Sequence, residues 1–223
     1  MCGRFVLIAS LADVIEEFDV ADFAGSFTQR YNIAPGSEVA AVIHDGANRI
    51  VFMKWGLVPS WAKDPSIGNR MINARAETVG EKPSFRDSFR KRRCLIPASG
   101  YYEWRKSGGR KIPYYIHARS GKPFGFAGLY DTWVAPDGAP VRTCTIITTE
   151  ATETVRSIHD RMPLVIPKHT MPRWLDPSLT DTKILIPLLA GSPEEYLEAY
   201  EVSTLVNSPK NDSPRLIEPV SPG

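Results

Sequence analysis

The sequence of 223 residues lacks several features that would place a chain in a familiar class. No apolar run approaches the ~20 residues that a membrane-spanning helix needs. The N-terminus has no charged segment followed by a long apolar stretch and a cleavage site, so a secretory signal is not expected. We therefore expect no contact with membranes, and the cytoplasm is the default compartment.

Metal, disulfide and nucleotide motifs are absent too. The histidines form no HxxxH pair and the cysteines no CxxC pair, so we expect neither a metal site nor a disulfide framework. No GxGxxG or GxxxxGK[ST] segment is present to bind a nucleotide, and no cofactor is expected. The three cysteines are Cys2, Cys94 and Cys144, and the last two lie in apolar strand contexts that predict core positions.

The net charge does not by itself indicate a nucleic-acid-binding protein, because 27 Lys and Arg against 25 Asp and Glu leave only +2. A local basic surface can still bind phosphates while the average stays near neutral. One stretch is locally basic, with a single acid, Asp87, among Lys82, Arg86, Arg90, Lys91, Arg92 and Arg93. It is either a solvated face or a phosphate-binding surface, and composition leaves both readings open.

The pattern of the chain predicts one domain over residues 1–223, in which strands come first and short helices follow. Ser10 caps a helix, and turn residues join predicted strands at 38–44 with 49–58, 101–105 with 112–118, and 124–134 with 141–149. A further strand is expected at 94–96, and helices at 151–158, 168–175, 181–189 and 193–200. A strand is expected at 201–206, and a proline-rich tail from about 207. This order predicts an α+β fold with curved, mostly antiparallel sheets forming an open barrel-like core with flanking short helices.

The chemistry begins at Cys2. Removal of Met1, which aminopeptidases perform when the next residue is small, would leave an α-amine and a thiol on one residue. Their ordinary pKa values are about 8 and about 8.5, so both are partly nucleophilic near neutral pH. A 1,2-aminothiol condenses with an aldehyde to a Schiff base, and the thiol then closes a thiazolidine ring, a step favoured by its intramolecular geometry. Taken alone, Cys2 is equally compatible with an ordinary small buried residue.

Several further segments occur in a characteristic order. They are Met1-Cys2-Gly3-Arg4-Phe5, Tyr31-Asn32-Ile33-Ala34-Pro35, Trp55-Gly56-Leu57-Val58-Pro59-Ser60-Trp61, Asn73-Ala74-Arg75-Ala76-Glu77-Thr78, Ser99-Gly100-Tyr101-Tyr102-Glu103-Trp104, Ile158-His159-Asp160-Arg161-Met162-Pro163 and Val206-Asn207-Ser208-Pro209. The ordered set resembles the SRAP (SOS response-associated peptidase) family of abasic-site processing proteins.

The resemblance implies a catalytic group around Cys2, which matches the cysteine that forms a thiazolidine with the aldehyde of an abasic site. Glu103 and His159 match the family's active-site acid and histidine, which suit proton transfer. Asn73 matches an asparagine that contacts the cysteine and the sugar. From the residues alone, Glu103 could instead be a solvent-facing strand residue, His159 a structural histidine and Asn73 a turn residue.

The resemblance also implies a DNA-binding surface. Arg4, Arg75 and Arg161 match phosphate-contacting arginines, whose guanidinium groups bind phosphates bidentately, and Asn32 would add a polar contact. Trp55 and Trp61 bracket a turn, where aromatic faces can stack on bases. Surface ion pairs for the arginines and core packing for the tryptophans are the alternatives.

The function implied is capture of abasic sites in single-stranded DNA by a covalent thiazolidine crosslink that shields the lesion during the DNA damage response. The partner is single-stranded DNA that contains abasic sites, with association with the nucleoid when bound. Self-cleavage of Met1 (peptidase) and a weak lyase activity at the abasic site are further possibilities, although an ordinary aminopeptidase suffices to release Met1. Nothing in the sequence demands a protein partner or more than a monomer.

Two other readings stay open. An N-terminal cysteine also serves as the nucleophile of glutamine amidotransferases, in which the free amine acts as base, but no second set of glutamine-binding motifs is found. Alternatively, the arginines and tryptophans bind single-stranded nucleic acid without covalent chemistry, and affinity would then depend only on salt-sensitive contacts.

Overall fold

A barrel of five strands forms the centre of the computed structural model, which describes residues 2–23, 25, 28–191 and 197–220. Its antiparallel order β11-β10-β7-β4-β5 is closed by parallel pairing of β11 with β5, where Cys144 lies opposite Trp55. The predicted α+β class, with curved and mostly antiparallel sheets around a barrel-like core, is confirmed. The barrel is closed rather than open, because the closing pair joins segments far apart in the chain. The strands are β4 (Glu38–His44), β5 (Asn48–Trp55), β7 (Arg93–Ala98), β10 (Phe124–Val134) and β11 (Pro140–Glu150).

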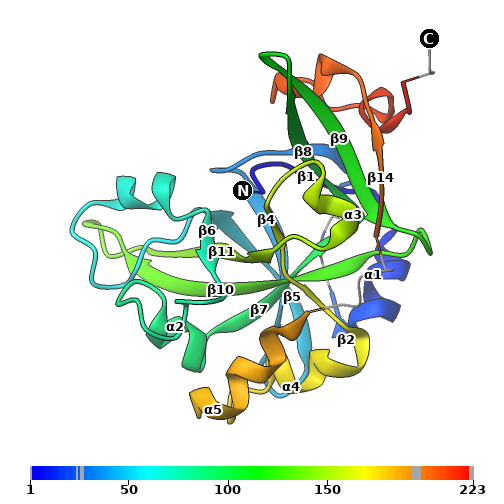
Figure 1. Cartoon of the computed structure of the whole chain (residues 1–223). Coiled ribbons are helices and arrows are strands. Elements are labelled where there is room, and N and C mark those ends of the chain that lie inside the picture. The colour runs from blue at the N-terminus through cyan, green and yellow to red at the C-terminus, as the bar shows by residue number, and fades with distance from the viewer. Residues whose placement is uncertain (1, 24, 26–27, 192–196, 221–223) are drawn as a thin grey trace.

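A second sheet, with the order β14-β9-β8-β1-β3, projects from the barrel (Figure 1). Its strands are β1 (Phe5–Leu7), β3 (Arg30–Ile33), β8 (Gly100–Ser107), β9 (Arg110–Ala118) and β14 (Leu197–Glu201). The hairpin between β8 and β9 turns at Gly108 and Gly109, whose φ angles of 54° and 78° are readily adopted only by glycine. All three hairpins predicted from turn residues are present.

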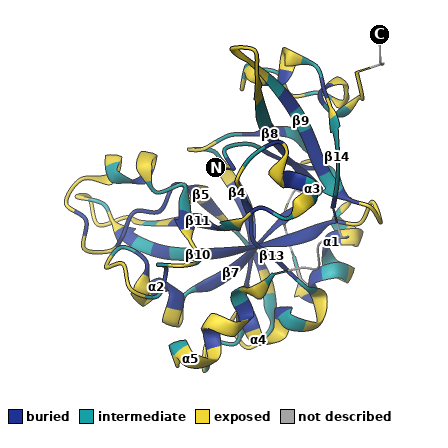
Figure 2. Ribbon diagram, viewed as in Figure 1, coloured by how far each residue is buried: buried dark blue, intermediate teal, exposed yellow. Residues whose placement is uncertain are grey.

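Alternation along β1 and β8 divides the second sheet into two faces. Phe5 and Tyr101 face the barrel, where Phe126 contacts both rings edge-on at centroid distances of 5.9 and 6.0 Å. Val6 and Tyr102 face the opposite side and belong to a separate apolar cluster beneath the C-terminal segment. Figure 2 shows the buried residues concentrated along the barrel strands and continuing into this second sheet. Burial of each large side chain stabilises the fold by about 1.5–3 kcal/mol.

Four short strands attach to the barrel, and two of them flank the end of β11. These two are β6 (Asn73–Arg75), parallel to β11, and β12 (Arg161–Pro163), antiparallel to it. Thr148 of β11 lies opposite Arg75 on one side and Pro163 on the other. This arrangement brings three predicted site residues, Asn73, Arg75 and Arg161, to one edge of the barrel. The other two strands, on β5 and β10, are β2 (Val20–Asp22) and β13 (Val165–Ile166).

Helices are short and lie around the barrel, as the sequence predicted. The first shows a capping box, in which the Ser10 side chain accepts from the Asp13 N–H and the Asp13 carboxylate accepts from the Ser10 N–H. The α-helices are α1 (Leu11–Phe18), α2 (Arg86–Lys91), α3 (Glu153–Arg156), α4 (Met171–Leu175) and α5 (Thr182–Leu185). The 3-10 turns are η1 (Pro65–Arg70), η2 (Lys168–Thr170), η3 (Ile186–Ala190), η5 (Thr204–Asn207) and η6 (Pro214–Ile217). In the part of the chain that the structure describes, no helix is long and apolar enough to cross a membrane.

The C-terminal region differs from the sequence prediction. Residues 197–200, predicted as helix, form strand β14 against β9; the rest of that predicted helix, 193–196, lies outside the described residues. The predicted strand at 201–206 is also wrong, because only Glu201 is in β14 and η5 begins at Thr204. Pairing with the edge of β9 and packing of Tyr200 against Tyr115 override the local helical pattern. The proline-rich tail folds into η5 and η6, and it buries Val206 and Leu216.

Candidate active site

Cys2 is positioned by strand pairing. Phe5 of β1 lies opposite Tyr101 of β8, and the Tyr102 N–H donates to the Arg4 carbonyl at 3.0 Å, so pairing continues beyond β1 toward Cys2. The Cys2 thiol donates to the same carbonyl at 3.8 Å. A thiol on a regular strand extension is held in one place without a loop of its own, which suits a reacting group.

The Cys2 thiol is fully buried in the chain that includes Met1. Burial raises the pKa of this thiol well above its ordinary value, and the nearby carboxylate of Glu103 raises it further. The thiol is therefore protonated at neutral pH. Its reactivity must come from proximity to a reaction partner rather than from a standing thiolate.

Glu103 lies two residues after Tyr101 on β8 and is only 3% exposed. Burial raises the pKa of its carboxyl group, and the positive charge of a protonated His159 acts in the opposite direction. A buried acid with a raised pKa can hold a proton near neutral pH and deliver it. The alternative of a solvent-facing strand residue is excluded, since the side chain is enclosed. Electrostatic interaction of Glu103 with both Cys2 and His159 places these three groups in one neighbourhood.

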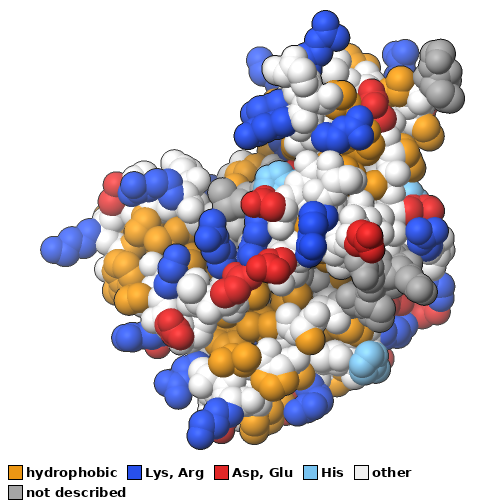
Figure 3. Space-filling view, in the orientation of Figure 1, with side chains coloured by type: hydrophobic (Ala, Val, Ile, Leu, Met, Phe, Trp, Pro, Cys, Tyr) orange, Lys and Arg blue, Asp and Glu red, His pale blue; other side chains and the backbone are white. Residues whose placement is uncertain are grey.

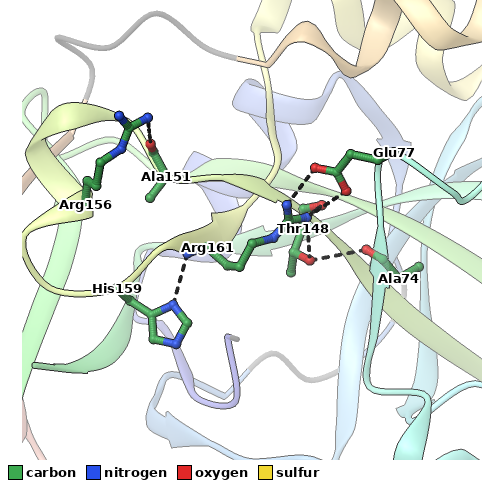
Figure 4. A network of polar contacts seen from close by, with 7 residues as sticks. All are labelled: Ala74, Glu77, Thr148, Ala151, Arg156, His159 and Arg161. Atoms are coloured by element: carbon green, nitrogen blue, oxygen red, sulfur yellow. Dashed lines mark hydrogen bonds and ion pairs between the residues drawn. The ribbon is translucent and has the colours of Figure 1, made fainter. Parts of the chain in front are cut away.

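His159 precedes β12, and its Nδ1 atom has two competing neighbours. The Arg161 backbone N–H lies at 3.0 Å (Figure 4), and the Asp160 carboxylate lies at 2.8 Å. One nitrogen cannot accept from the first and donate to the second at once. The neutral ring accepts from Arg161, which leaves Nε2–H as a donor, and the protonated ring donates to Asp160. Because Asp160 is 86% exposed, water screens that ion pair.

Arg161 is held by the residues around it (Figure 4). Its Nη1 and Nη2 atoms donate to the two Glu77 oxygens at 2.6 and 3.0 Å, and Nη2 also donates to the Thr148 carbonyl at 2.6 Å. The hydrogen bond from Arg161 lowers the pKa of Glu77. A guanidinium already occupied by a carboxylate must exchange that partner before it can bind a phosphate. The sequence analysis did not single out Glu77, although it is the first acid after Arg75.

Asn73 and Arg75 lie on β6 beside β11. Arg75 is exposed, whereas both amide atoms of Asn73 are buried and have no hydrogen-bond partner among the described residues. A buried unpaired amide is costly and commonly marks a place where another molecule completes the site. No hydrogen bond joins Asn73 to Cys2 in the described part of the chain, so its predicted contact with the cysteine stays a prediction.

Arg4 and Asn32 hold the C-terminal segment. The Arg4 guanidinium donates to the carbonyls of Val206 and Asn207 at 2.8 and 3.2 Å and to the Asn32 side-chain oxygen at 2.9 Å. Asn32 is fully buried, and its amide donates to the carbonyls of Ser208 and Asn211. These donors are thus used by the chain itself, and phosphate contact by either residue would require the tail to release them.

The two tryptophans have different environments. Trp55 is buried, donates its indole N–H to the Ile72 carbonyl at 2.8 Å and packs on Phe5, so its ring has no face available to a base. This placement corresponds to the core-packing alternative. Trp61 is 59% exposed. The residues on either side of Trp61 are anchored to β10. The Ser60 N–H donates to the Asp131 carboxylate, and the Ala62 carbonyl accepts from the indole N–H of Trp133.

Two arginines of the basic stretch around α2 have structural roles, while Lys82, Arg86, Arg90 and Lys91 are exposed. Arg93 is buried and donates to four backbone carbonyls, and Arg92 pairs with Asp131 at 3.3 Å. These two arginines are therefore unavailable to phosphates. Figure 3 shows other Lys and Arg side chains on both sides of a hollow between the β8–β9 projection and the barrel.

Among residues 2–23, 25, 28–191 and 197–220, no group of three or more His, Cys, Asp and Glu is arranged to hold a metal ion. A cleft of about 750 Å³ between α1, the β4–β5 turn and α4 contains none of the predicted site residues. The candidate site is instead defined by buried reactive groups beside exposed basic ones.

A closed five-stranded barrel, with Cys2 on a strand extension and Glu103 and His159 as neighbours, defines the class of α+β protein to which this chain belongs. The model of the SOS response associated peptidase (SRAP) family matches residues 1–209, and the chain belongs to this family.

Named relatives extend the comparison. The chain is 48% identical over 222 residues to the abasic site processing protein YoqW of Bacillus subtilis, covering 98% of this chain and 99% of that one. It is 33% identical to the abasic site processing protein HMCES of Gallus gallus, covering 89% of this chain and 68% of that one. A crystal structure of a protein from Bacteroides thetaiotaomicron superposes with a TM-score of 0.86 at 30% identity, covering 98% of this chain and all of that one.

Proposed function

We propose that this chain captures abasic sites in single-stranded DNA by forming a covalent thiazolidine through Cys2 once Met1 has been removed. The observation that carries the proposal is the shared neighbourhood of Cys2, Glu103 and His159. The chain belongs to a family with relatives named abasic site processing proteins, and this membership supports the abasic site as the proposed target. Undamaged nucleotides offer no aldehyde, so discrimination follows from the chemistry itself.

The proposed reaction has two bond-forming stages. The neutral α-amine of Cys2 attacks the aldehyde carbon of the opened sugar, and the resulting carbinolamine loses its hydroxyl as water to give a C=N bond. The sulfur then bonds to the same carbon, the thiol gives up its proton and the nitrogen gains one. The net change is the loss of one water. Glu103, whose buried carboxyl group has a raised pKa, supplies the proton for water loss, and His159 donates a hydrogen bond to a sugar oxygen.

Binding of the strand is proposed to use the exposed Arg75 and the partly buried Arg161 as phosphate contacts. The exposed ring of Trp61 is proposed to stack on a base. Arg4 and Asn32 support the site indirectly by holding the tail. We propose that the chain acts as a monomer and associates with the nucleoid when bound to DNA.

The test is denaturing electrophoresis and intact-mass analysis of the Met1-free protein with single-stranded DNA that carries one abasic site. Intact DNA and the Cys2→Ala protein are the controls. A heat-stable adduct whose mass equals protein plus DNA minus one water, absent from both controls, is expected. Without that adduct the covalent proposal fails. Salt-sensitive binding alone would then favour the non-covalent reading, and glutaminase activity would favour the amidohydrolase reading.

Two finer activities are proposed at the same site. The first is release of Met1 by the chain itself, which predicts that the purified Glu103→Gln protein retains Met1 while the wild type loses it. Equal loss in both proteins would point to an ordinary aminopeptidase. The second is weak strand cleavage, since a Schiff base at an abasic site promotes β-elimination before the thiol closes the ring.

A further inference from the structure

The hydroxyl group of Tyr101 is buried and takes no part in the hydrogen bonding of the described residues. Tyr101 is completely buried, and its hydroxyl has no hydrogen-bond partner among the described residues. Leaving a buried donor unpaired costs about 1–3 kcal/mol, so such groups are uncommon in folded chains. A phenylalanine would fill the same space without that cost.

The position of this hydroxyl relates it to the reacting groups. Tyr101 precedes Glu103 by two residues on β8, so both side chains leave the same face of the strand. Its register partner is Phe5, three residues after Cys2. Burial raises the pKa of the Tyr101 hydroxyl, and the charges of Cys2 and then Glu103 add to the effect, so the hydroxyl lies near both and remains a neutral donor.

The neighbouring tyrosine shows what a structural hydroxyl looks like in this sheet. Tyr102 points to the opposite face, and its hydroxyl donates to the Tyr31 carbonyl at 2.8 Å. Among the predicted catalytic residues, Asn73 also has buried side-chain atoms without a hydrogen-bond partner in the described residues. Unpaired buried atoms occur elsewhere too, as at Thr145 and Thr152, so it is the position of Tyr101 on the Glu103 face of β8 that relates its hydroxyl to the site.

We propose that Tyr101 is a substrate-contacting residue whose hydroxyl donates a hydrogen bond to an oxygen of the abasic deoxyribose as that sugar is captured at Cys2. The inference rests on the proposed function and adds a contact to it. The hydroxyl is paired only when the sugar is present, so the contact favours the captured state over the free one. Intact DNA, which does not enter the pocket at Cys2, gains nothing from it.

The test compares Tyr101→Phe with Tyr102→Phe in single-turnover crosslinking to single-stranded DNA with one abasic site. Tyr101→Phe is expected to lower the crosslinking rate about tenfold or more, because a specific hydrogen bond to substrate is lost. Its urea midpoint is expected to be equal or higher, and its affinity for intact single-stranded DNA unchanged. Tyr102→Phe, the matched control, is expected to have a lower urea midpoint and a crosslinking rate within twofold of wild type.

Three results would overturn the inference. Tyr101→Phe could crosslink at the wild-type rate, or Tyr102→Phe could lose rate to the same extent, which would indicate a general effect on the sheet. If the wild-type protein formed no crosslink at all, the proposed function would fail, and this contact would fail with it. The first two outcomes leave the proposed function standing, so the two failures are distinguishable.

Discussion

Glu77 and DNA phosphates compete for the same guanidinium in the proposed interface. The two carboxylate oxygens of Glu77 accept hydrogen bonds from Nη1 and Nη2 of Arg161, at 2.6 and 3.0 Å. Thr148 separately holds Nη2 through its carbonyl at 2.6 Å. Replacing Glu77 by Gln removes the charge and weakens the pair, while Thr148 keeps the arginine in place. We therefore expect Glu77→Gln to increase the affinity for intact single-stranded DNA.

The magnitude follows from the exposure of the pair. The Arg161 side chain is 13% exposed and that of Glu77 46%, so solvent screens the interaction, and about 1 kcal/mol is a suitable value. Since 1.4 kcal/mol corresponds to tenfold in Kd, the expected gain is about fivefold at low salt. The gain should shrink as ionic strength rises, because the competing charges are partly exposed.

Fluorescence anisotropy with intact single-stranded DNA measures this affinity without covalent chemistry. Glu150→Gln is the matched control, since Glu150 is exposed and lies opposite Arg161 in the β11–β12 pairing. It removes the same charge without touching the guanidinium. In an Arg161→Gln background, Glu77→Gln should have no further effect. A clear loss of affinity in folded Glu77→Gln would refute the competition, because it would mean that Glu77 holds Arg161 in its binding pose.

Three other predictions concern stability and chemistry. Asn32→Ala should lower the free energy of unfolding by roughly 3 kcal/mol, because it loses the bond from Arg4 and three bonds to carbonyls of the C-terminal segment, of which the one to Val206 is long at 3.4 Å. Asn211→Ala, which loses one exposed bond, should cost less than ~1 kcal/mol. Equal urea midpoints for the two variants would contradict this. Burial raises the pKa of the Cys144 thiol from 9.0 to about 12, so the folded chain keeps a proton that the unfolded chain loses. The stabilisation that this proton provides is complete below pH 9 and is lost as the pH rises toward 12. In Cys144→Ala the urea midpoint should therefore fall less steeply with pH across that range. An unchanged pH dependence would contradict the raised pKa of Cys144. Cys2→Ser keeps the amine but loses the thiol, so the adduct should become heat-labile unless reduced with borohydride, and strand cleavage should increase; a stable adduct without reduction would disprove the need for sulfur.

Local patterns predicted the parts of the fold that depend on neighbouring residues. Turn residues such as Asp45 and Gly108 located the hairpins, and Ser10 located the start of α1. The parallel contact between β5 and β11 that closes the barrel was not predicted, because nothing in either strand records its distant partner. For the same reason residues 197–200, which carry a helical pattern, form a strand once the edge of β9 is available.

The candidate site divides in the same way. The types and order of residues predicted the neighbourhood of Cys2, Glu103 and His159 through the family resemblance. The resemblance did not predict which polar groups the chain itself would occupy. Arg4 is used by the tail and Trp55 by the core, and these roles depend on tertiary contacts that no local motif encodes. Tyr101 lies within one of the family segments, but the segment alone assigns it no role, because an unpaired hydroxyl can be recognised only once its surroundings are known.

The burial of Cys2 raises a question of rate, since a protonated thiol is a poor nucleophile. Each pH unit between the ambient pH and the raised pKa of this thiol lowers the thiolate fraction about tenfold. Tethering works against this loss, because well-oriented intramolecular reactions reach effective molarities of about 10⁵ M or more. Once the amine has bonded to the aldehyde carbon, the sulfur is only three bonds from that amine, and its attack closes a five-membered ring. Under the proposed chemistry, proximity therefore offsets several pH units of lost thiolate, and it does so only after an aldehyde is bound. The same burial keeps the thiol protonated, and so less reactive toward oxidants, while no lesion is present.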